Sequence, residues 1–183
     1  MAIGDVLREA RLQLGITQEQ VGGIAYISPK TVSAYETGRR TVAPEVMEVL
    51  VKQLDHPRLC MEAAAAVTGG AYCSPWLDGE RVDFHRVSVW AKVLEELEEA
   101  KQAVGAVCLV NYPQADDCET MQRVQESLMQ LLDARVAIDH YAAVICRDFG
   151  LSISAVYQAH RVKLESRGYV KPRQKKAATK AVR

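Results

Sequence analysis

TQEQVGGIAYISPKTVSAYETG, residues 17–38, has the pattern of two short helices joined by a tight turn. Thr17 has the side chain of an N-cap, and Gln20 stands at the third position of a capping box, so a helix is predicted to begin here. Ser28 has the side chain of a second N-cap. Pro29 follows it at the first helical position, where a missing N–H costs no hydrogen bond.

Apolar residues recur at three- and four-residue spacing on both predicted helices, as expected for faces that pack together. These residues are Val21, Ile24, Ala25, Val32 and Tyr35. Ala25 is small, so we expect the second helix to cross close to it. Gly38 follows the last apolar residue and predicts the end of the second helix.

The order Thr-Gln, small Ala, Ile-Ser, Thr-Val-Ser and Tyr-Glu-x-Gly resembles the phage-repressor/Cro-like (Xre) helix-turn-helix family. The resemblance runs from about Ile3 to about Leu54, close to a third of the chain. It implies a DNA-binding transcription regulator whose recognition helix, at 28–37, lies in the major groove.

By position, the resemblance implies a set of base-reading residues on that helix. They are Pro29, Lys30, Ser33 and Ala34, with Ser28 and Thr31 nearby. Lys30 can donate to guanine, and Ala34 can touch a thymine methyl group. Pro29 departs from the family pattern, in which a polar side chain is common, so shape readout gains importance.

Phosphate contacts are expected on either side of the recognition helix. Gln18 stands where the family contacts phosphate at a helix start, aided by unpaired N–H groups. Arg39 and Arg40, in the following loop, are expected to clamp phosphates without reading sequence. The alternative for both arginines is an ordinary solvated loop.

Two further positions have structural roles by resemblance. Arg11, on the first helix, pairs in related repressors with the residue that is Glu36 here, which predicts a largely buried ion pair. Tyr26 occupies the turn position where glycine is common, so strain is expected if its φ is positive.

The rest of the first third predicts further helices and an all-α fold class. Apolar stripes indicate helices at 3–14 and 44–54, Pro57 is expected to break the pattern, and an alanine-rich helix follows at 59–67. The expectation is a five-helix DNA-binding domain at 1–68. Residues 69–85, rich in glycine and polar groups, form a linker or an ordered loop.

Residues 86–171 are predicted to be a helical domain for assembly or sensing. Its first helix, 86–104, has one stripe of Val89, Trp90, Val93, Leu94, Leu97 and Ala100, with Glu95, Glu96, Glu98 and Glu99 solvated. The inner face of a long helix at 118–148 is predicted as Val124, Leu128, Leu131, Leu132, Arg135, Ile138, Ala142 and Ile145. So long a stripe needs a partner, either the 86–104 helix or another subunit. Between the helices, 107–110 is expected to be a buried connection.

The segment 141–170 carries a weaker, degenerate helix-turn-helix pattern around Gly150. Two ordinary amphipathic helices with a glycine turn satisfy the same spacing, and we favour that interpretation.

Charge is distributed unevenly although the net charge is zero. Residues 1–60 hold seven basic and seven acidic side chains, 61–159 hold seven and fifteen, and 160–183 hold nine and one. The basic end is compatible with phosphate binding. The tail at 172–183 lacks apolar periodicity and is predicted to be disordered.

Five scattered cysteines without a CxxC pair, and a charged amphipathic start instead of a secretory signal, indicate a reduced cytoplasmic home. A zinc site from Cys60, Cys73 and His56 or His85 fits no standard ligand spacing. We expect no metal, cofactor or membrane span.

The leading hypothesis is a transcription regulator, with repression favoured by resemblance to prophage and mobile-element proteins. It would bind an inverted-repeat operator in double-stranded DNA as a homodimer. The alternative is an antitoxin-like module whose acidic half binds a basic protein. Catalysis is not expected, because the pairs His85/Asp83 and Cys146/Asp148 lack any nucleophile elbow, phosphate loop or metal-ligand spacing.

Overall fold

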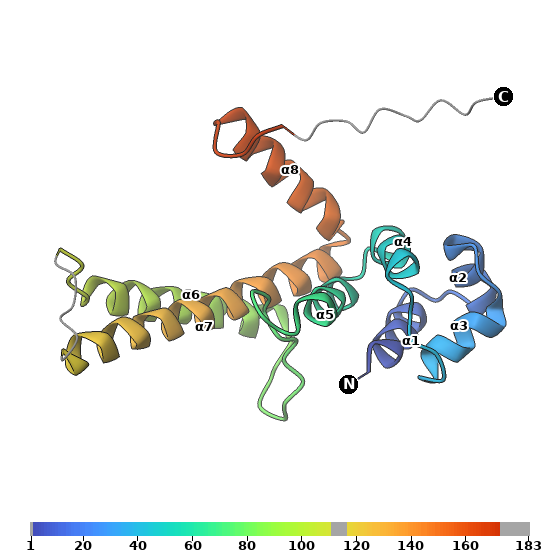
Figure 1. The fold of residues 1–183 in the computed structure, drawn as a ribbon, viewed down its shortest axis with the longest axis horizontal. Coiled ribbons are helices and arrows are strands. Elements are labelled where there is room, and N and C mark those ends of the chain that lie inside the picture. The colour runs from blue at the N-terminus through green and yellow to red at the C-terminus, as the bar shows by residue number, and fades with distance from the viewer. Residues whose placement is uncertain (1, 111–116, 173–183) are drawn as a thin grey trace.

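The computed structural model describes residues 2–110 and 117–172, and all regular secondary structure in those residues is helical, which confirms the all-α class. The helices are α1 (Ile3–Gln13), α2 (Gln18–Ala25), α3 (Pro29–Glu36), α4 (Pro44–Leu54), α5 (Pro57–Thr68), α6 (Arg86–Gly105), α7 (Cys118–Phe149) and α8 (Ile153–Ser166). Figure 1 shows α1 to α5 clustered, α6 and α7 forming a long arm, and α8 projecting from its base. The predicted basic tail beyond Pro172 lies outside the described residues.

The main hydrophobic core lies within α1 to α5. Each helix contributes a fully or almost fully buried side chain, respectively Leu7, Val21, Val32, Leu50 and Leu59. Removing these side chains from water is the main favourable term that holds the five helices together.

The caps predicted for the hairpin of α2 and α3 are present. Thr17 Oγ1 accepts from the Gln20 N–H at 3.2 Å, and Gln20 Oε1 accepts from the Thr17 N–H at 2.8 Å, which completes the capping box. Ser28 Oγ accepts from the Thr31 N–H at 3.1 Å, and Pro29 is the first residue of α3.

Gly22 permits a close approach of the backbone in this hairpin. A Cβ atom on Gly22 would lie 2.6 Å from the carbonyl oxygen of Ile27, where no side chain fits. Ala25, where a close crossing was expected, is buried in the core. The close approach at Gly22 was not predicted.

The chain does break between α4 and α5, but the helix predicted at 59–67 begins earlier than expected. Pro57 is the first residue of α5, and His56 precedes it as the N-cap, so the helix begins before the predicted Leu59. Proline at this position costs no helical hydrogen bond. α5 packs on α1 and α4 and also meets α7.

Residues 69–85 form an ordered loop along α7. Ser74 Oγ donates to Asp139 Oδ2 at 2.5 Å, and Arg135 Nη2 donates to the carbonyl oxygen of Tyr72 at 2.6 Å. These bonds attach the loop to residues of α7 that are distant from it in the sequence.

α6 and α7 pack against each other along the arm, but not by the single stripe predicted for 86–104. The residues of α6 that are buried are Val89, Val93, Glu96 and Ala100. Trp90, Leu94 and Leu97 are about half exposed. Glu96, predicted to be solvated, is held at its carboxylate by Lys92 Nζ at 2.7 Å.

The predicted inner face of α7 is also largely exposed. Leu128, Leu131, Leu132 and Ile138 are 43–57% exposed, whereas the smaller Ser127 and Ala134 are buried. Small side chains allow two helices to approach closely, so α6 pairs with the small-residue face of α7. The larger apolar residues are left outside.

Residues 107–110 do not form the expected buried connection. Leu109 and Val110 are exposed, and Val110 is the last described residue before the gap at 111–116.

α8 has little contact with the rest of the protein. Ile153 is its one buried residue, and the Ser154 N–H donates to Asp55 Oδ1 at 3.0 Å. Val156 is exposed, and residues 141–149 are the end of the 32-residue α7. A helix-turn-helix unit would need Val156 packed inward. Residues 141–170 therefore do not form a second helix-turn-helix unit.

Candidate nucleic-acid interface

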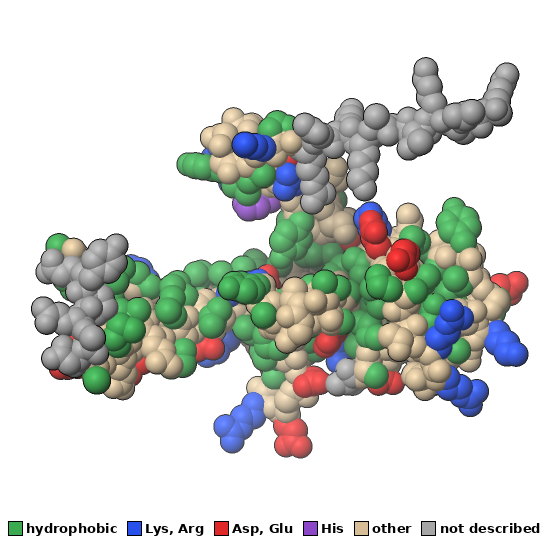
Figure 2. Space-filling view, in the orientation of Figure 1, with side chains coloured by type: hydrophobic (Ala, Val, Ile, Leu, Met, Phe, Trp, Pro, Cys, Tyr) green, Lys and Arg blue, Asp and Glu red, His purple; other side chains and the backbone are tan. Residues whose placement is uncertain are grey.

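The recognition helix predicted at 28–37 corresponds to α3, which is anchored from one side. Val32 and Tyr35 are buried in the core, and Glu36 at the helix end is buried as well. The opposite side remains accessible. Lys and Arg side chains project from the end of the molecule that carries α3 and its following loop (Figures 1 and 2).

The N-terminal turn of α3 presents polar groups to solvent. Pro29 and Lys30 are exposed there. The Ser28 and Thr31 hydroxyls are 2.9 Å apart and hydrogen-bond to each other. Either hydroxyl can still accept or donate one further bond, since a hydroxyl has one donor and two acceptor sites.

Ser33 and Ala34 lie further along α3 and are half-buried. Their carbonyl oxygens tie down the following loop. Ser33 O accepts from Thr37 Oγ1 at 2.7 Å, and Ala34 O accepts from the Arg40 N–H at 3.1 Å.

The two loop arginines are placed differently. Both Arg39 and Arg40 are exposed, but the Arg40 guanidinium lies 5.8 Å from the centroid of the Tyr35 ring, within cation–π range. Tyr35 therefore orients Arg40 at the edge of α3.

Arg11 and Glu36 are brought together as a bidentate pair. Arg11 Nε donates to Glu36 Oε1 at 2.6 Å, and Arg11 Nη2 donates to Glu36 Oε2 at 3.1 Å. The Glu36 side chain is 2% exposed. The hydrogen bond from the guanidinium to Glu36 raises the pKa of Arg11, against a smaller opposing effect of burial.

Gln18, expected to contact phosphate, takes part in the same network. Its Nε2 donates to Glu36 Oε2 at 2.8 Å. The start of α2, the end of α3 and α1 are thus joined through one carboxylate. No local sequence pattern indicates this role of Gln18, because the pairing depends on how α2 crosses α3.

An aromatic cluster that the sequence did not predict joins the loop 69–85 to α7. Trp76, Phe84 and His140 stack with ring centroids 4.9–5.7 Å apart. The Arg58 guanidinium lies 5.4 Å from the Trp76 ring, and Arg58 Nη1 donates to Glu9 Oε2 of α1 at 2.6 Å. These contacts connect the arm to α1 and α5.

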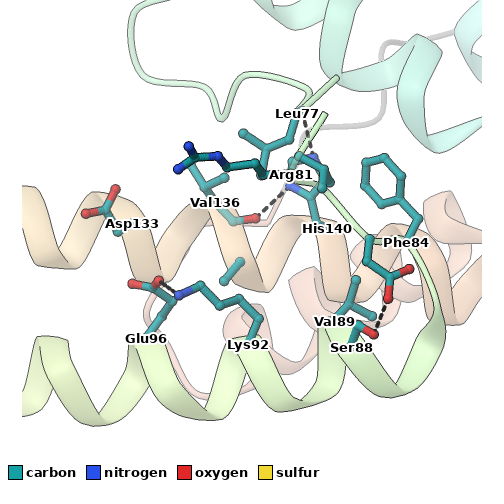
Figure 3. A pocket seen from close by; sticks show the side chains of 13 residues that line it. Leu77, Arg81, Phe84, Ser88, Val89, Lys92, Glu96, Asp133, Val136 and His140 are labelled. Atoms are coloured by element: carbon teal, nitrogen blue, oxygen red, sulfur yellow. Dashed lines mark hydrogen bonds and ion pairs between the residues drawn. The ribbon is translucent and has the colours of Figure 1, made fainter. Parts of the chain in front are cut away.

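Beside this cluster is an open cavity of about 420 Å³ between the loop and the arm (Figure 3). His140 lies at its wall and is 3% exposed. The Leu77 N–H donates to His140 Nε2 at 3.1 Å, and Nδ1 donates to Val136 O at 2.8 Å, so the ring is held as the neutral Nδ1–H tautomer. Lys92 and Glu96 pair across the floor (Figure 3).

The remaining candidate chemistry is limited. The five cysteines are free, and burial raises the pKa of the Cys60 thiol to about 11, which keeps it protonated. Within residues 2–110 and 117–172, no group of three or more His, Cys, Asp or Glu side chains is arranged to hold a metal ion. No helix among these residues has the length and apolar character to cross a membrane.

Residues 7–57 match the protein-family model described as Helix-turn-helix. The N-terminal third of the chain is therefore an Xre/Cro-like helix-turn-helix domain, as its resemblance implied. Such a domain indicates a DNA-binding transcription regulator. Neither a curated protein nor a solved structure matched the chain.

Proposed function

We propose that this protein is a sequence-specific transcription repressor that inserts α3 into the major groove of double-stranded DNA. The observation that carries the proposal is the asymmetry of α3 within the matched region. One face is locked into the core by Val32 and Tyr35, and the N-terminal turn is left exposed. We infer repression, rather than activation, from the resemblance to phage repressors.

Lys30 is assigned the main base contact. It is the exposed cation on the first turn of α3, and lysine donates to the O6 and N7 atoms of guanine. Ser33 and Ala34 lie one turn further, suited to a polar contact and to a thymine methyl group. Pro29 offers no side-chain hydrogen bond, which leaves part of the specificity to DNA shape.

The phosphate contacts are assigned to residues that flank α3. Arg39 and Arg40 clamp the backbone, and the Ser28–Thr31 pair adds one hydroxyl donor, because the other hydroxyl hydrogen is used in their mutual bond. Gln18 can bind a phosphate and Glu36 at the same time, because its Nε2 carries two hydrogens and the bond to Glu36 uses one.

The protein acts as a homodimer on an inverted repeat, in the reduced cytoplasm that its free thiols suit. One small recognition domain makes few contacts. A dimer reads two half-sites about one helical turn apart and gains affinity without new kinds of contact.

Selection of binding sites from a random DNA pool tests this function. We expect the wild type to enrich an inverted repeat. Lys30→Ala and Ser33→Ala should each weaken that enrichment. Sequence-indifferent binding that disappears when the residues after Pro172 are removed would contradict it. Co-purification of a basic protein in place of DNA would favour the antitoxin-like alternative.

A further inference from the structure

The arm carries an apolar face that the described structure leaves about half exposed, with the loop at Tyr72 reaching it only at Arg135. Its large side chains are each 44–55% exposed on α6 and 43–55% exposed on α7. On α6 they are Val87, Trp90, Leu94, Leu97 and Val104, and on α7 they are Met121, Leu128, Leu131 and Ile138. We refer to these two sets as the outer stripes.

Both outer stripes have the spacing of a coiled-coil seam. The α6 positions are 87, 90, 94, 97, 101 and 104, and the α7 positions are 121, 124, 128, 131, 135 and 138. Each alternates steps of three and four residues, which is the pattern of helices that pair with further helices. Each also has one basic residue, Lys101 or Arg135, at its fifth position.

The two outer stripes lie on the same side of the arm. On α6 the stripe is rotated by roughly 100° from the buried seam through Val93 and Ala100, and on α7 by a similar angle in the same sense from Ser127 and Ala134. Because the helices run in opposite directions, equal rotations bring both stripes to one face. The Leu77–Phe84 part of the loop lies on the other face, beside His140 (Figure 3), whereas the Tyr72 carbonyl oxygen accepts from Arg135 near one end of the α7 stripe. Figure 2 shows hydrophobic side chains along the arm.

The exposed apolar area is comparable to the apolar part of a standard dimer interface, which is somewhat more than half of the buried surface. Full burial of a Val, Leu, Ile or Met side chain removes roughly 60–120 Å² of apolar area from water, so nine large side chains at about half exposure leave on the order of 400 Å² of apolar surface. A standard interface buries about 800 Å² per partner, whereas single-chain proteins rarely expose a contiguous patch beyond a few hundred Å².

We propose that two copies of this chain pair through the outer stripes, so that α6 and α7 of each copy form a four-helix bundle around a two-fold axis. A two-fold axis brings the same surface of both copies together, so the outer stripes of one copy face those of the other. The stripes share one spacing, which lets their side chains interdigitate. The charged positions within the stripes are both basic, which disfavours a basic protein as the occupant. Lys101 is the polar seam position that limits affinity and fixes register.

This pairing rests on the homodimer of the proposed function and names its interface. It is measured without DNA, so the result is independent of whether the protein binds an operator. Sedimentation equilibrium of the full chain should give twice the 20.2 kDa chain mass. The double variant Leu94→Glu/Leu131→Glu should be a monomer with unchanged helical circular dichroism. Val67→Glu, an exposed apolar position on α5, is the matched control and should remain a dimer.

Lys101→Leu provides a test that misfolding cannot imitate, since the proposal expects a gain. Completing the seam should lower the dimer Kd by about tenfold. Lys52→Leu on α4 is the matched control, because Lys52 is also an exposed lysine paired with a nearby glutamate, and it should leave Kd unchanged. A monomeric wild type, a dimer that survives the double glutamate variant, or an unchanged Kd for Lys101→Leu would each overturn the proposal.

Discussion

Glu36 is almost completely buried, and its charge is compensated by side chains from two other helices. Arg11 binds both of its oxygens, and Gln18 adds a third hydrogen bond. A buried carboxylate left without its partner is costly, because desolvation is no longer offset.

Arg11→Ala should therefore lower the free energy of unfolding by ~3–5 kcal/mol. Chemical denaturation at neutral pH measures the change. Arg8→Ala is the control, since Arg8 is an exposed arginine on the same helix and its loss should cost under about 0.5 kcal/mol. Equal, small losses for both variants would show that the pair does not stabilise the fold.

Tyr26 adopts the left-handed conformation that its turn requires, with φ 56° and ψ 39°. Its ring is 91% exposed, so no packing compensates for the strain of a Cβ there. Tyr26→Gly should raise the free energy of unfolding by about 1 kcal/mol. Tyr26→Ala, which keeps the Cβ, should give no comparable gain in thermal melts. Destabilisation by glycine would mean that the ring contributes a contact after all.

At the scale of elements, two neighbouring glycines of α2 have opposite roles. Gly22 faces the carbonyl oxygen of Ile27, whereas Gly23 has open space beside it. Gly22→Ala should destabilise by ~1–3 kcal/mol, because the turn into α3 must move. Gly23→Ala should instead stabilise by roughly 0.5–1 kcal/mol through helix propensity. Denaturant midpoints of the two variants give the comparison, and a gain in both would contradict the close approach at Gly22.

Asp55 links the end of α4 to the start of α8. Burial works to raise its pKa, but hydrogen bonds from Ser152 and Ser154 outweigh that effect and lower it. A lowered carboxyl pKa adds stability that is fully present above the ordinary value of 3.8 and is lost as the pH falls through the native value.

Asp55→Asn keeps the side-chain shape and tolerates the positive φ of this position. It should cost about 1 kcal/mol at neutral pH, the usual size of a helix-capping bond. Thermal melts of wild type and variant should converge as the pH falls below 3.8. A difference that stays constant over that range would show that the Asp55 charge is not involved.

The sequence was sufficient to predict helix ends in the hairpin, because Thr17, Ser28 and Pro29 act on their own backbone neighbours. It predicted helix faces less well. Trp90 and Val93 differ in burial although both are apolar, since the approach of α7 decides which side of α6 is covered. The roles of Gln18 and Trp76 also depend on contacts with distant residues. No local pattern encodes such contacts.

At the scale of the whole molecule, the DNA-binding region and the arm are joined by specific contacts. Arg58 bridges Glu9 of α1 and Trp76, which stacks with His140 of α7. This arrangement fixes where α3 lies relative to the arm, and it would let a dimer formed through the arms set the spacing between two recognition helices.

The central claim is that α3 reads base sequence. The most direct measurement titrates wild type, Lys30→Ala and the control Lys52→Ala against a selected duplex and a scrambled duplex, at one fixed salt concentration. The account predicts that Lys30→Ala loses ~1–3 kcal/mol of the preference for the selected duplex. Lys52→Ala should keep the full preference. A Lys30→Ala protein that discriminates as well as the wild type would contradict the account.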